Sequence, residues 1–583
     1  MTQTGARLRQ LFATILLFCT PAQPDRLWHD FRQYLCDDLP YRLRTLGIIN
    51  TSNDDIYDYG LYHIDHILQE SGHSLSDWPS MPTLQRQWDQ YSTNEMIAEQ
   101  LNYDHQTQHT FWQNHYHLLN NEQMTAYHRI LDSVENNTGG MFMINGPGGT
   151  GKTFLYKVIC SKLRGDGAIV LCTASSGIAA LLLPGGRTAH SMFKIPIDNL
   201  SQGSHCCIPK NSRRADLMRA AKCIIWDEIV PQHRYVVETL DRTLRDLRDC
   251  TRPFGGITLL MGGDFQQTLP IIPKGSREQI LDATITRSYL WNDVNVFHLH
   301  QNMRLHDNPE AEAFAKWLLE IGQGHNSDEN DEVEIPIDMQ SPNIKSLMTF
   351  VYSNFDFCSS PSPDYFLQRM ILAARNSDVN DVNQTLLEKM PGSTEIRHSA
   401  DQIIHESGAD SDDHRCSFVP PEFLRSITSP SLPPGELNIK IGCPLILLRN
   451  LSPKQGLCNG SRMVVIGLSQ WVLHVRLIGG DHDGELAFIP RISLIPTSTP
   501  NFTFKFKRRQ FPVRIAFAVT INKAQGQSVS YVGVDLRTPV FAHGQLYVAL
   551  SRVTAKQNIK ILLPHDNTNS KTKNIVYQEA LLR

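Results

Sequence analysis

The sequence Gly146-Pro-Gly-Gly-Thr-Gly-Lys152-Thr153 decides the fold of this chain. It follows the apolar run Met141 to Ile144 and precedes Phe154 to Leu163, whose apolar spacing predicts a helix. A strand, a glycine-rich loop and a helix in this order form a phosphate-binding loop, in which backbone N–H groups close around phosphates at a helix N-terminus. The residues predicted to bind the nucleotide are Gly146, Pro147, Gly148, Gly149, Thr150, Gly151, Lys152 and Thr153. Lys152 is expected on the β- and γ-phosphates and the Thr153 hydroxyl on Mg²⁺.

A pair of acids follows a later apolar run, Ile224 to Trp226. Carboxylates at the end of one parallel strand can face a phosphate loop on its neighbour. We therefore expect Asp227 to hold Mg²⁺ and Glu228 to orient and deprotonate a water molecule. A strand-end cap is the alternative for this pair. The next strand ends in Gly263 to Gln267, where an amide can reach a γ-phosphate and a second domain, or can simply form a turn.

Short apolar runs alternate with helical patterns along the middle of the chain, which predicts a parallel sheet covered by helices on both faces. From Met463 to Ile495 short β runs are separated by Gly479-Gly480 and Asp483-Gly484, both of which are turn signals. This stretch predicts a small β-barrel inserted into the second domain. The acidic segments 327–334 and 410–413 are expected to be solvated loops.

Length and composition bound the class of protein. The 583 residues imply more than one domain, and a formal net charge of −4 argues against a wholly basic DNA-coating protein. The 12 cysteines include no C-x-x-C, so disulfide frameworks and paired zinc knuckles are disfavoured, and a reducing compartment fits. The run Leu11 to Cys19 resembles the core of a signal peptide, but we expect it to form an amphipathic or buried helix of an accessory segment.

Several separated motifs resemble those of the superfamily 1B DNA helicases of the petite-integration-frequency type. Within that family, the chain resembles the helicases encoded by Helitron transposons. The likeness covers roughly residues 116 to 565. It rests on Leu119 to Gln123, Gly146 to Thr153, Thr173 to Ala180 with Thr188 to Phe193, Asp227-Glu228, Gly263 to Pro270, Leu299 to Arg304, Phe517 to Gln527 and Gly544 to Arg552. Pro231 departs from the family pattern, but it lies beyond both carboxylates.

The resemblance implies an α/β fold of two RecA-like domains with ATP between them. The expected divisions are an N-terminal, mostly helical accessory segment (1–115), a first RecA-like domain (116–305), a second (306–462 and 512–583), and an inserted SH3-like β module (463–511). The family also implies roles for single residues. Gln123 would read adenine, Gln267 would sense the γ-phosphate, and Arg304 and Arg552 would act as arginine fingers.

The resemblance further implies single-stranded DNA across the tops of both RecA-like domains. The predicted contacts are Thr173, Ser175, His190 and Phe193 in the first domain, and Thr520, Lys523 and Gln525 in the second; core packing competes for His190 and Phe193. A basic cluster alternates with phenylalanines; its cations are Lys505, Lys507, Arg508, Arg509 and Arg514. This spacing fits a strand with cations on one face and aromatic rings on the other, which is a further candidate for DNA contact. A solvated edge strand is the alternative.

The predicted function is that of an ATP- and Mg²⁺-dependent 5′→3′ DNA helicase. It would act on single-stranded and forked DNA in replication, repair, recombination, telomere maintenance or Helitron transposition. It would work as a monomer or as a dimer on DNA, without a membrane, in the nucleus or the mitochondrion, and not as a secreted protein. The alternatives are a decayed transposon relic that only binds DNA and a single-strand translocase that unwinds weakly. A P-loop kinase would not explain the later motifs.

Overall fold

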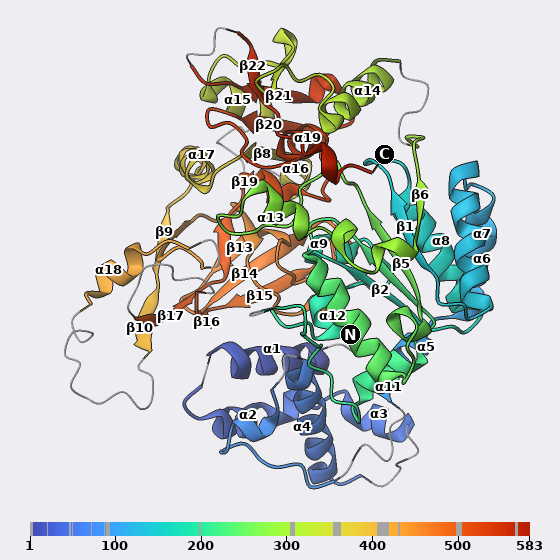
Figure 1. The fold of residues 1–583 in the computed structure, drawn as a ribbon. Coiled ribbons are helices and arrows are strands. Elements are labelled where there is room, and N and C mark those ends of the chain that lie inside the picture. Colours follow the sequence, from blue (N-terminus) through green and yellow to red (C-terminus); the bar gives the residue numbers. More distant parts are fainter. Residues whose placement is uncertain are drawn as a thin grey trace.

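The structure is a computed structural model. It describes residues 4–19, 21–45, 48, 51–70, 73–86, 88, 94–197, 200–303, 309–353, 363–404, 419–429, 432–496, 504–565 and 569–582. Figure 1 shows an N-terminal helical bundle beneath two α/β domains and a β module. None of the described helices is long and apolar enough to cross a bilayer.

The first α/β domain is built on a six-stranded parallel sheet of order β3-β2-β4-β5-β1-β6. Its strands are β1 (Met141–Asn145), β2 (Val170–Ala174), β3 (Arg187–Thr188), β4 (Cys223–Asp227), β5 (Thr258–Gly263) and β6 (Val294–His298). Its helices are α7 (Asn121–Glu135), α8 (Lys152–Gly165), α9 (Gly177–Leu181), α10 (Ala189–Phe193), α11 (Arg213–Ala220), α12 (Arg234–Leu247) and α13 (Arg277–Asp282).

Alternate residues of these strands enter two separate cores, because successive side chains on a strand point to opposite faces. Ile224 and Trp226 pack with α11 and α12 on one face, whereas Cys223 and Ile225 pack with α7 and α8 on the other. The run of five buried residues in β4 is therefore explained by helices on both faces of the sheet.

The second α/β domain has a four-stranded parallel sheet of order β19-β8-β20-β21. Its strands are β8 (Arg369–Ala373), β19 (Ala518–Thr520), β20 (Tyr531–Asp535) and β21 (Ile559–Leu562). Its helices are α14 (Pro309–Gln323), α15 (Ile344–Val351), α16 (Pro363–Leu367), α17 (Asn376–Lys389) and α19 (Gln545–Leu550). These two parallel sheets, each flanked by helices, confirm the predicted α/β class.

The predicted acidic loop 327–334 differs in part from the structure. Its end forms β7 (Glu332–Glu334), which pairs with β22 (Lys571–Lys573). Ion pairs join Asp328 to Lys571 at 2.8 Å and Glu332 to Lys573 at 3.5 Å. Lysines distant in the sequence explain why an acidic run enters a strand here. The other predicted acidic loop, 410–413, lies outside the described residues.

The β module extends beyond the predicted range 463–511. A five-stranded antiparallel sheet of order β15-β14-β13-β12-β18 joins strands on both sides of that range, and a three-stranded sheet, β10-β17-β16, lies beside it. The strands are β9 (Glu395–His398), β10 (Ala400–Ile404), β11 (Glu436–Ile439), β12 (Pro444–Leu447), β13 (Arg462–Leu468), β14 (Val472–Ile478), β15 (Leu486–Pro490), β16 (Ile492–Leu494), β17 (Lys505–Gln510) and β18 (Val513–Ile515). The helix α18 (Pro421–Ser426) accompanies them.

Strand β17 corrects the predicted separation of cations from aromatic rings. Arg508 is buried on the same face as Phe506, and it pairs with the buried Asp401 at 2.8 Å. Its guanidinium also donates to the carbonyl oxygens of Leu424 and Ile427. Arg508 is therefore a structural cation, and the outward face of this strand carries fewer charges than the sequence suggested.

The N-terminal bundle packs around a core that includes Phe12, Leu16 and Trp28. Its helices are α1 (Thr4–Cys19), α2 (Pro24–Leu35), α3 (Leu39–Thr45) and α4 (Asn53–Glu70). The apolar run at residues 11–19 therefore lies in a packed helix, as predicted. The following helices α5 (Glu95–Leu101) and α6 (His105–Tyr116) instead pack on α11 and α8 of the first α/β domain, on the other side of the predicted boundary at residue 115.

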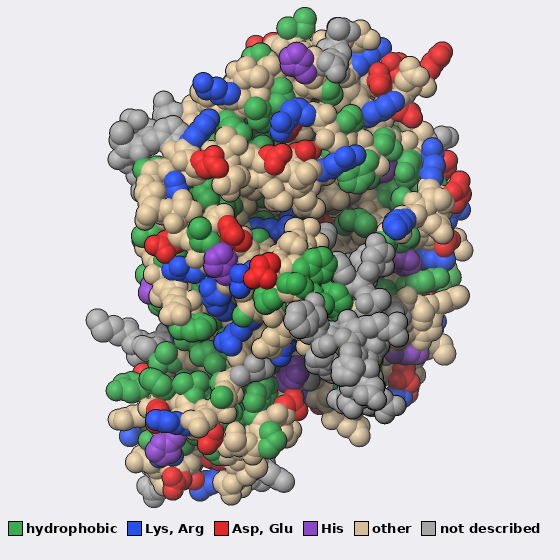
Figure 2. Space-filling view, turned by 90° about the vertical axis from the view of Figure 1, so that its left-hand side faces the viewer, with side chains coloured by type: hydrophobic (Ala, Val, Ile, Leu, Met, Phe, Trp, Pro, Cys, Tyr) green, Lys and Arg blue, Asp and Glu red, His purple; other side chains and the backbone are tan. Residues whose placement is uncertain are grey.

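Figure 2 shows Lys and Arg side chains interspersed with Asp and Glu over one face of the molecule, including the bundle at the bottom. This mixture agrees with the near-neutral net charge of the chain.

Candidate nucleotide and DNA site

A cavity of about 400 Å³ lies between the two α/β domains. The first domain contributes the phosphate-binding loop, Asp227 and Glu228, and the second contributes Gln525, Gly526 and Arg552. The volume falls within the range of ~300–1,000 Å³ that small-molecule sites occupy. Motifs far apart in the sequence therefore meet at one site.

The phosphate-binding loop turns between β1 and α8 with Gly149 at φ +92° and Gly151 at φ +81°. A β-carbon on Gly148 would meet nothing within 4 Å, so this backbone is open to a ligand. Lys152 Nζ donates to the carbonyl oxygens of Gly146 and Pro147, the latter at 3.0 Å. The lysine ammonium and the start of α8 therefore present positive charge to the cavity.

The two acids after β4 have different environments. Asp227 is buried, and burial raises the pKa of its carboxyl, although the nearby Lys152 lowers it. Burial and the charge of Asp227 raise the pKa of Glu228 to about 7. A carboxyl group with a pKa near the working pH is suited to accept a proton.

Glu228 is held in place by both domains. Its backbone has φ +52°, and its Oε2 accepts a hydrogen bond of 3.2 Å from the hydroxyl of Ser176. From the other domain, Gly526 lies so close that a β-carbon there would be 2.5 Å from Glu228 Oε1. Sequence reasoning missed Ser176 and Gly526, although both lie within motifs that it had identified.

Thr153 is half-buried at the start of α8 and lines the cavity with Asp227. A hydroxyl and a carboxylate are oxygen ligands of the kind that Mg²⁺ prefers. The residues present therefore fit a magnesium ion bound together with nucleotide phosphates.

Gln267 lines the cavity, and its amide Nε2 donates to Asp264 Oδ2 at 3.1 Å. The hydroxyl of Tyr547, on α19 of the second domain, donates to the same oxygen at 3.1 Å. Asp264 and Tyr547 are both buried. Neither residue was predicted, but Asp264 is only three positions from Gln267.

Two further hydrogen bonds cross between the domains beside this carboxylate. The Thr268 hydroxyl donates to Gln525 Oε1 at 2.7 Å, and His543 Nε2 lies 3.0 Å from the carbonyl oxygen of Phe265. His543 Nδ1 accepts from the backbone N–H of Tyr577, so Nε2 carries the proton. Burial lowers the pKa of His543 to about 4, which keeps this neutral form.

The two predicted arginine fingers have different outcomes. Arg552 lines the cavity, and its guanidinium donates to the carbonyl oxygens of Gln527 at 2.8 Å and Ala524 at 3.2 Å. The positive charge of Arg552, in the second domain, lowers the pKa of Glu228 in the first domain. Arg304 lies outside the described residues.

Gln123 lies beneath the phosphate-binding loop, and its role in adenine reading stays a prediction. Its side chain is buried, its Oε1 accepts from the N–H of Asn120, and its Nε2 donates to the carbonyl oxygen of Thr150, each at 3.0 Å. Gln123 therefore supports the phosphate-binding loop from behind. Asn302 and Met303 line the cavity instead, and the N–H of Met303 donates to Gly149 O at 2.9 Å.

Three of the seven predicted DNA contacts are engaged elsewhere. Thr173 is fully buried and donates to Ile225 O at 2.9 Å. Phe193 is fully buried against Trp226. Gln525 lines the nucleotide cavity. The predictions for Thr173 and Phe193 are wrong because these side chains complete the core of the first domain.

The other four predicted contacts are partly exposed. Ser175 directly follows β2 and His190 lies on α10, and burial lowers the pKa of His190. Thr520 and Lys523 line a separate cavity of about 520 Å³ between the second domain and the β module. Burial, and then the charge of Arg514, lower the pKa of Lys523 to about 8. Their DNA contact stays a prediction.

Comparison with known proteins shows what the chain resembles. Residues 118–332 match the model of the PIF1-like helicase family, and residues 422–468 match that of the 2B domain of the DNA helicase Pif1. The zebrafish (Danio rerio) ATP-dependent DNA helicase PIF1 is 27% identical over 454 residues, which cover 76% of this chain and 61% of the relative. The chain thus spans about three fifths of that relative's length.

Two solved structures show the same fold. The crystal structure of Pif1 helicase from Candida albicans has 23% identity and a TM-score of 0.54, covering 79% of this chain and 98% of its own. A Bacteroides Pif1 helicase in complex with ADP-AlF3 and single-stranded DNA has 22% identity and a TM-score of 0.54. The match covers 78% of this chain and 94% of the Bacteroides chain.

Proposed function

We propose that this chain, which belongs to the PIF1-like helicase family, is an ATP-dependent DNA helicase. It would hydrolyse ATP to move along single-stranded DNA in the 5′→3′ direction and to unwind duplex DNA. The observation that carries this proposal is the shared cavity: the phosphate-binding loop and Glu228 of the first domain meet Gly526 and Arg552 of the second.

The residues of the cavity support ATP hydrolysis as the reaction. Lys152 and the loop backbone would bind the phosphates, and Glu228 would accept the proton of the attacking water. Thr153 and Asp227 would hold Mg²⁺, which neutralises phosphate charge when bound. Arg552 would supply positive charge from the second domain, as arginine fingers do.

Hydrolysis would move the two domains through hydrogen bonds that join the cavity to the second domain. Asp264 holds Gln267 of the cavity and accepts a hydrogen bond from Tyr547 across the boundary. A change at the γ-phosphate that moves Gln267 would therefore reach α19 of the second domain. Repeated closing and opening of this boundary would step the protein along a strand.

The relatives support the substrate. The Bacteroides helicase of the same fold binds single-stranded DNA, and another solved structure of this fold, with a TM-score of 0.54, describes two coordinating Pif1 helicases on forked DNA. We propose the same substrates here, a monomer or a pair on a fork, and a role in replication, repair, recombination, telomere maintenance or transposition, in the nucleus or the mitochondrion.

The proposal is tested by ATPase activity with and without single-stranded DNA. We expect DNA to stimulate hydrolysis by the wild type, and Lys152→Ala to abolish hydrolysis while leaving the fold intact. Hydrolysis that is indifferent to DNA would contradict the helicase proposal and favour another P-loop enzyme.

A further inference from the structure

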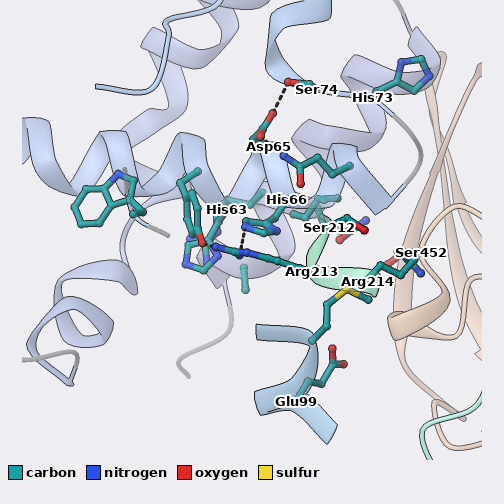
Figure 3. A pocket seen from close by; sticks show the side chains of 18 of the residues that line it. His63, Asp65, His66, His73, Ser74, Glu99, Ser212, Arg213, Arg214 and Ser452 are labelled. Atoms are coloured by element: carbon teal, nitrogen blue, oxygen red, sulfur yellow. Dashed lines mark hydrogen bonds between the residues drawn. The ribbon is translucent and has the colours of Figure 1, made fainter. Parts of the chain in front are cut away.

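A crevice of about 1,530 Å³ lies between the N-terminal bundle, the first α/β domain and the β module (Figure 3). One wall is formed by α1, α3, α4 and the segment after α4. The second wall is α5 with residues 194–214, and the third includes His482 and Glu485 of the β module. The bundle lies outside the segments that match the helicase family models.

The crevice carries an excess of positive charge. Among the described residues that line it, seven are Arg or Lys and four are Asp or Glu. The bundle supplies Arg7, Arg9, Arg42 and Arg86, and the first domain supplies Lys194, Arg213 and Arg214. Arg9 and Arg42 pair with Asp38, and Arg86 pairs with Asp55; these two acids lie behind the wall and do not line the crevice. Burial, and then the charges of Arg9 and Arg42, lower the pKa of His63 to about 3, as expected of a positive potential. The ligand that fits this wall is anionic.

The crevice begins at the predicted DNA edge of the first domain. Lys194, which lines the crevice, is the C-cap of α10, the helix that carries His190. Arg214 donates to the carbonyl oxygens of Ser191 (3.1 Å) and Met192 (2.7 Å) of that helix. A strand that passes His190 would therefore meet the cations of the crevice next.

The bundle is attached across the crevice by specific contacts. Figure 3 shows Arg213 reaching His66 on α4, at 2.9 Å, and it also donates to the Tyr62 hydroxyl at 3.0 Å. Arg7 pairs with Glu485 of the β module at 3.4 Å. The bundle is thus held against both the first domain and the β module as one wall of the crevice.

The size of the crevice and the residues that line it indicate which kind of anionic ligand fits. It exceeds the ~300–1,000 Å³ of small-molecule pockets, so a polymer fits better. Tyr62 and Trp88 line it but are buried, so their faces are not free platforms for bases. Contact would be to phosphates, independent of sequence.

We propose that the crevice between the N-terminal bundle, the first α/β domain and the β module is a second DNA-binding segment, which holds the phosphates of the single strand beyond the motor domains. This inference rests on the proposed function. The bundle would lengthen the strand held by the protein and slow its release during translocation.

The test compares Arg42→Gln with Arg86→Gln against a matched control, Arg26→Gln with Arg44→Gln. Both double variants remove two positive charges from exposed or half-exposed arginines of the same bundle, but Arg26 and Arg44 do not line the crevice. Binding is measured by fluorescence anisotropy with oligothymidines of about 8 and about 30 nucleotides, because one module occupies ~4–16 nucleotides.

The crevice variant is expected to bind the long oligomer about tenfold more weakly than the control and the short oligomer equally well. Its slope of log affinity against log salt should fall by about 0.7 for each phosphate that the protein no longer neutralises. Equal affinity and slope in the two double variants would overturn the proposal. If the double variant melts early, Arg7→Gln is measured in the same way.

The outcome is separable from that of the proposed function. Stimulation of the wild-type ATPase by the short oligomer reports on the motor alone. If DNA stimulates the wild-type ATPase but the two double variants bind DNA equally well, only the proposal of a second DNA-binding segment fails. With stimulation absent in the wild type, the helicase proposal itself fails.

Discussion

A β-carbon placed on Gly526 would lie 2.5 Å from Oε1 of Glu228, the residue that we propose as the catalytic base. The two residues belong to different α/β domains. Glycine is required at this position for two reasons, since its φ of +75° is also a conformation that other residues rarely adopt. The hydrolytic site therefore depends on a close approach of the second domain.

Gly526→Ala should reduce ATP turnover at least ~100-fold, the lower end of what a general base contributes. Its β-carbon would displace the carboxylate or separate the domains. The matched control is Gly484→Ala, where φ is +78° and nothing lies within 4 Å of the added carbon. Both substitutions should cost about 1–2 kcal/mol of stability from the left-handed backbone. Equal ATPase activity in the two variants would contradict the close approach.

The pH dependence of ATP turnover should report the ionisation of Glu228, the proposed catalytic base. Because the pKa of Glu228 is raised to about 7, its carboxylate form prevails above that pH and is lost below it. Turnover at saturating ATP should therefore fall as the pH drops through about 7 and be level above it. In Glu228→Gln, nucleotide binding should persist while turnover is lost at every pH. A wild-type profile that is flat between pH 5 and 8 would exclude this role.

Tyr547→Phe removes the hydroxyl that donates to Asp264 and keeps the ring. The loss of one hydrogen bond to a buried carboxylate should cost about 1.5–3 kcal/mol in the free energy of unfolding. DNA-stimulated turnover should fall more than basal turnover, because this contact links the cavity to the second domain. Tyr531→Phe, on the same domain, is the control. A change in stability alone, with normal stimulation, would assign Tyr547 a purely structural role.

Arg508→Met should destabilise the chain by about 3–5 kcal/mol, because Asp401 would be left buried without its partner. The measurement is urea denaturation, and the control is Arg509→Met on the outward face of the same strand. A loss in Arg508→Met no larger than in the control would contradict the buried ion pair.

Much of the fold could be predicted from the sequence, because most parallel strands of the motor domains are short apolar runs that alternate with helix signals; the two-residue β3 (Arg187–Thr188) has no such run. The cavity could be predicted for the same reason: Lys152, Thr153, Asp227 and Glu228 follow strands of one sheet. The β module was harder. Strands such as β10 and β12 pair with partners about 70–110 residues later, and no local pattern carries that pairing.

Side-chain direction explains the other differences. Arg508 and Phe506 share a face because they are two residues apart, and the distant Asp401 and backbone carbonyl oxygens make a buried arginine acceptable there. Thr173 and Phe193 lie in motifs associated with DNA, but their own strand and helix turn them into the core. A motif locates the backbone of a site, whereas packing decides which of its side chains reach the ligand.

Unwinding of tailed duplexes tests the central claim most directly. Duplexes with either a 5′ or a 3′ single-stranded tail are incubated with the protein, ATP and Mg²⁺, with Lys152→Ala as the inactive control. We predict that the wild type separates only the duplex with the 5′ tail and that Lys152→Ala separates neither. Unwinding from the 3′ tail alone, or equal unwinding by Lys152→Ala, would contradict a 5′→3′ helicase driven by ATP at this site.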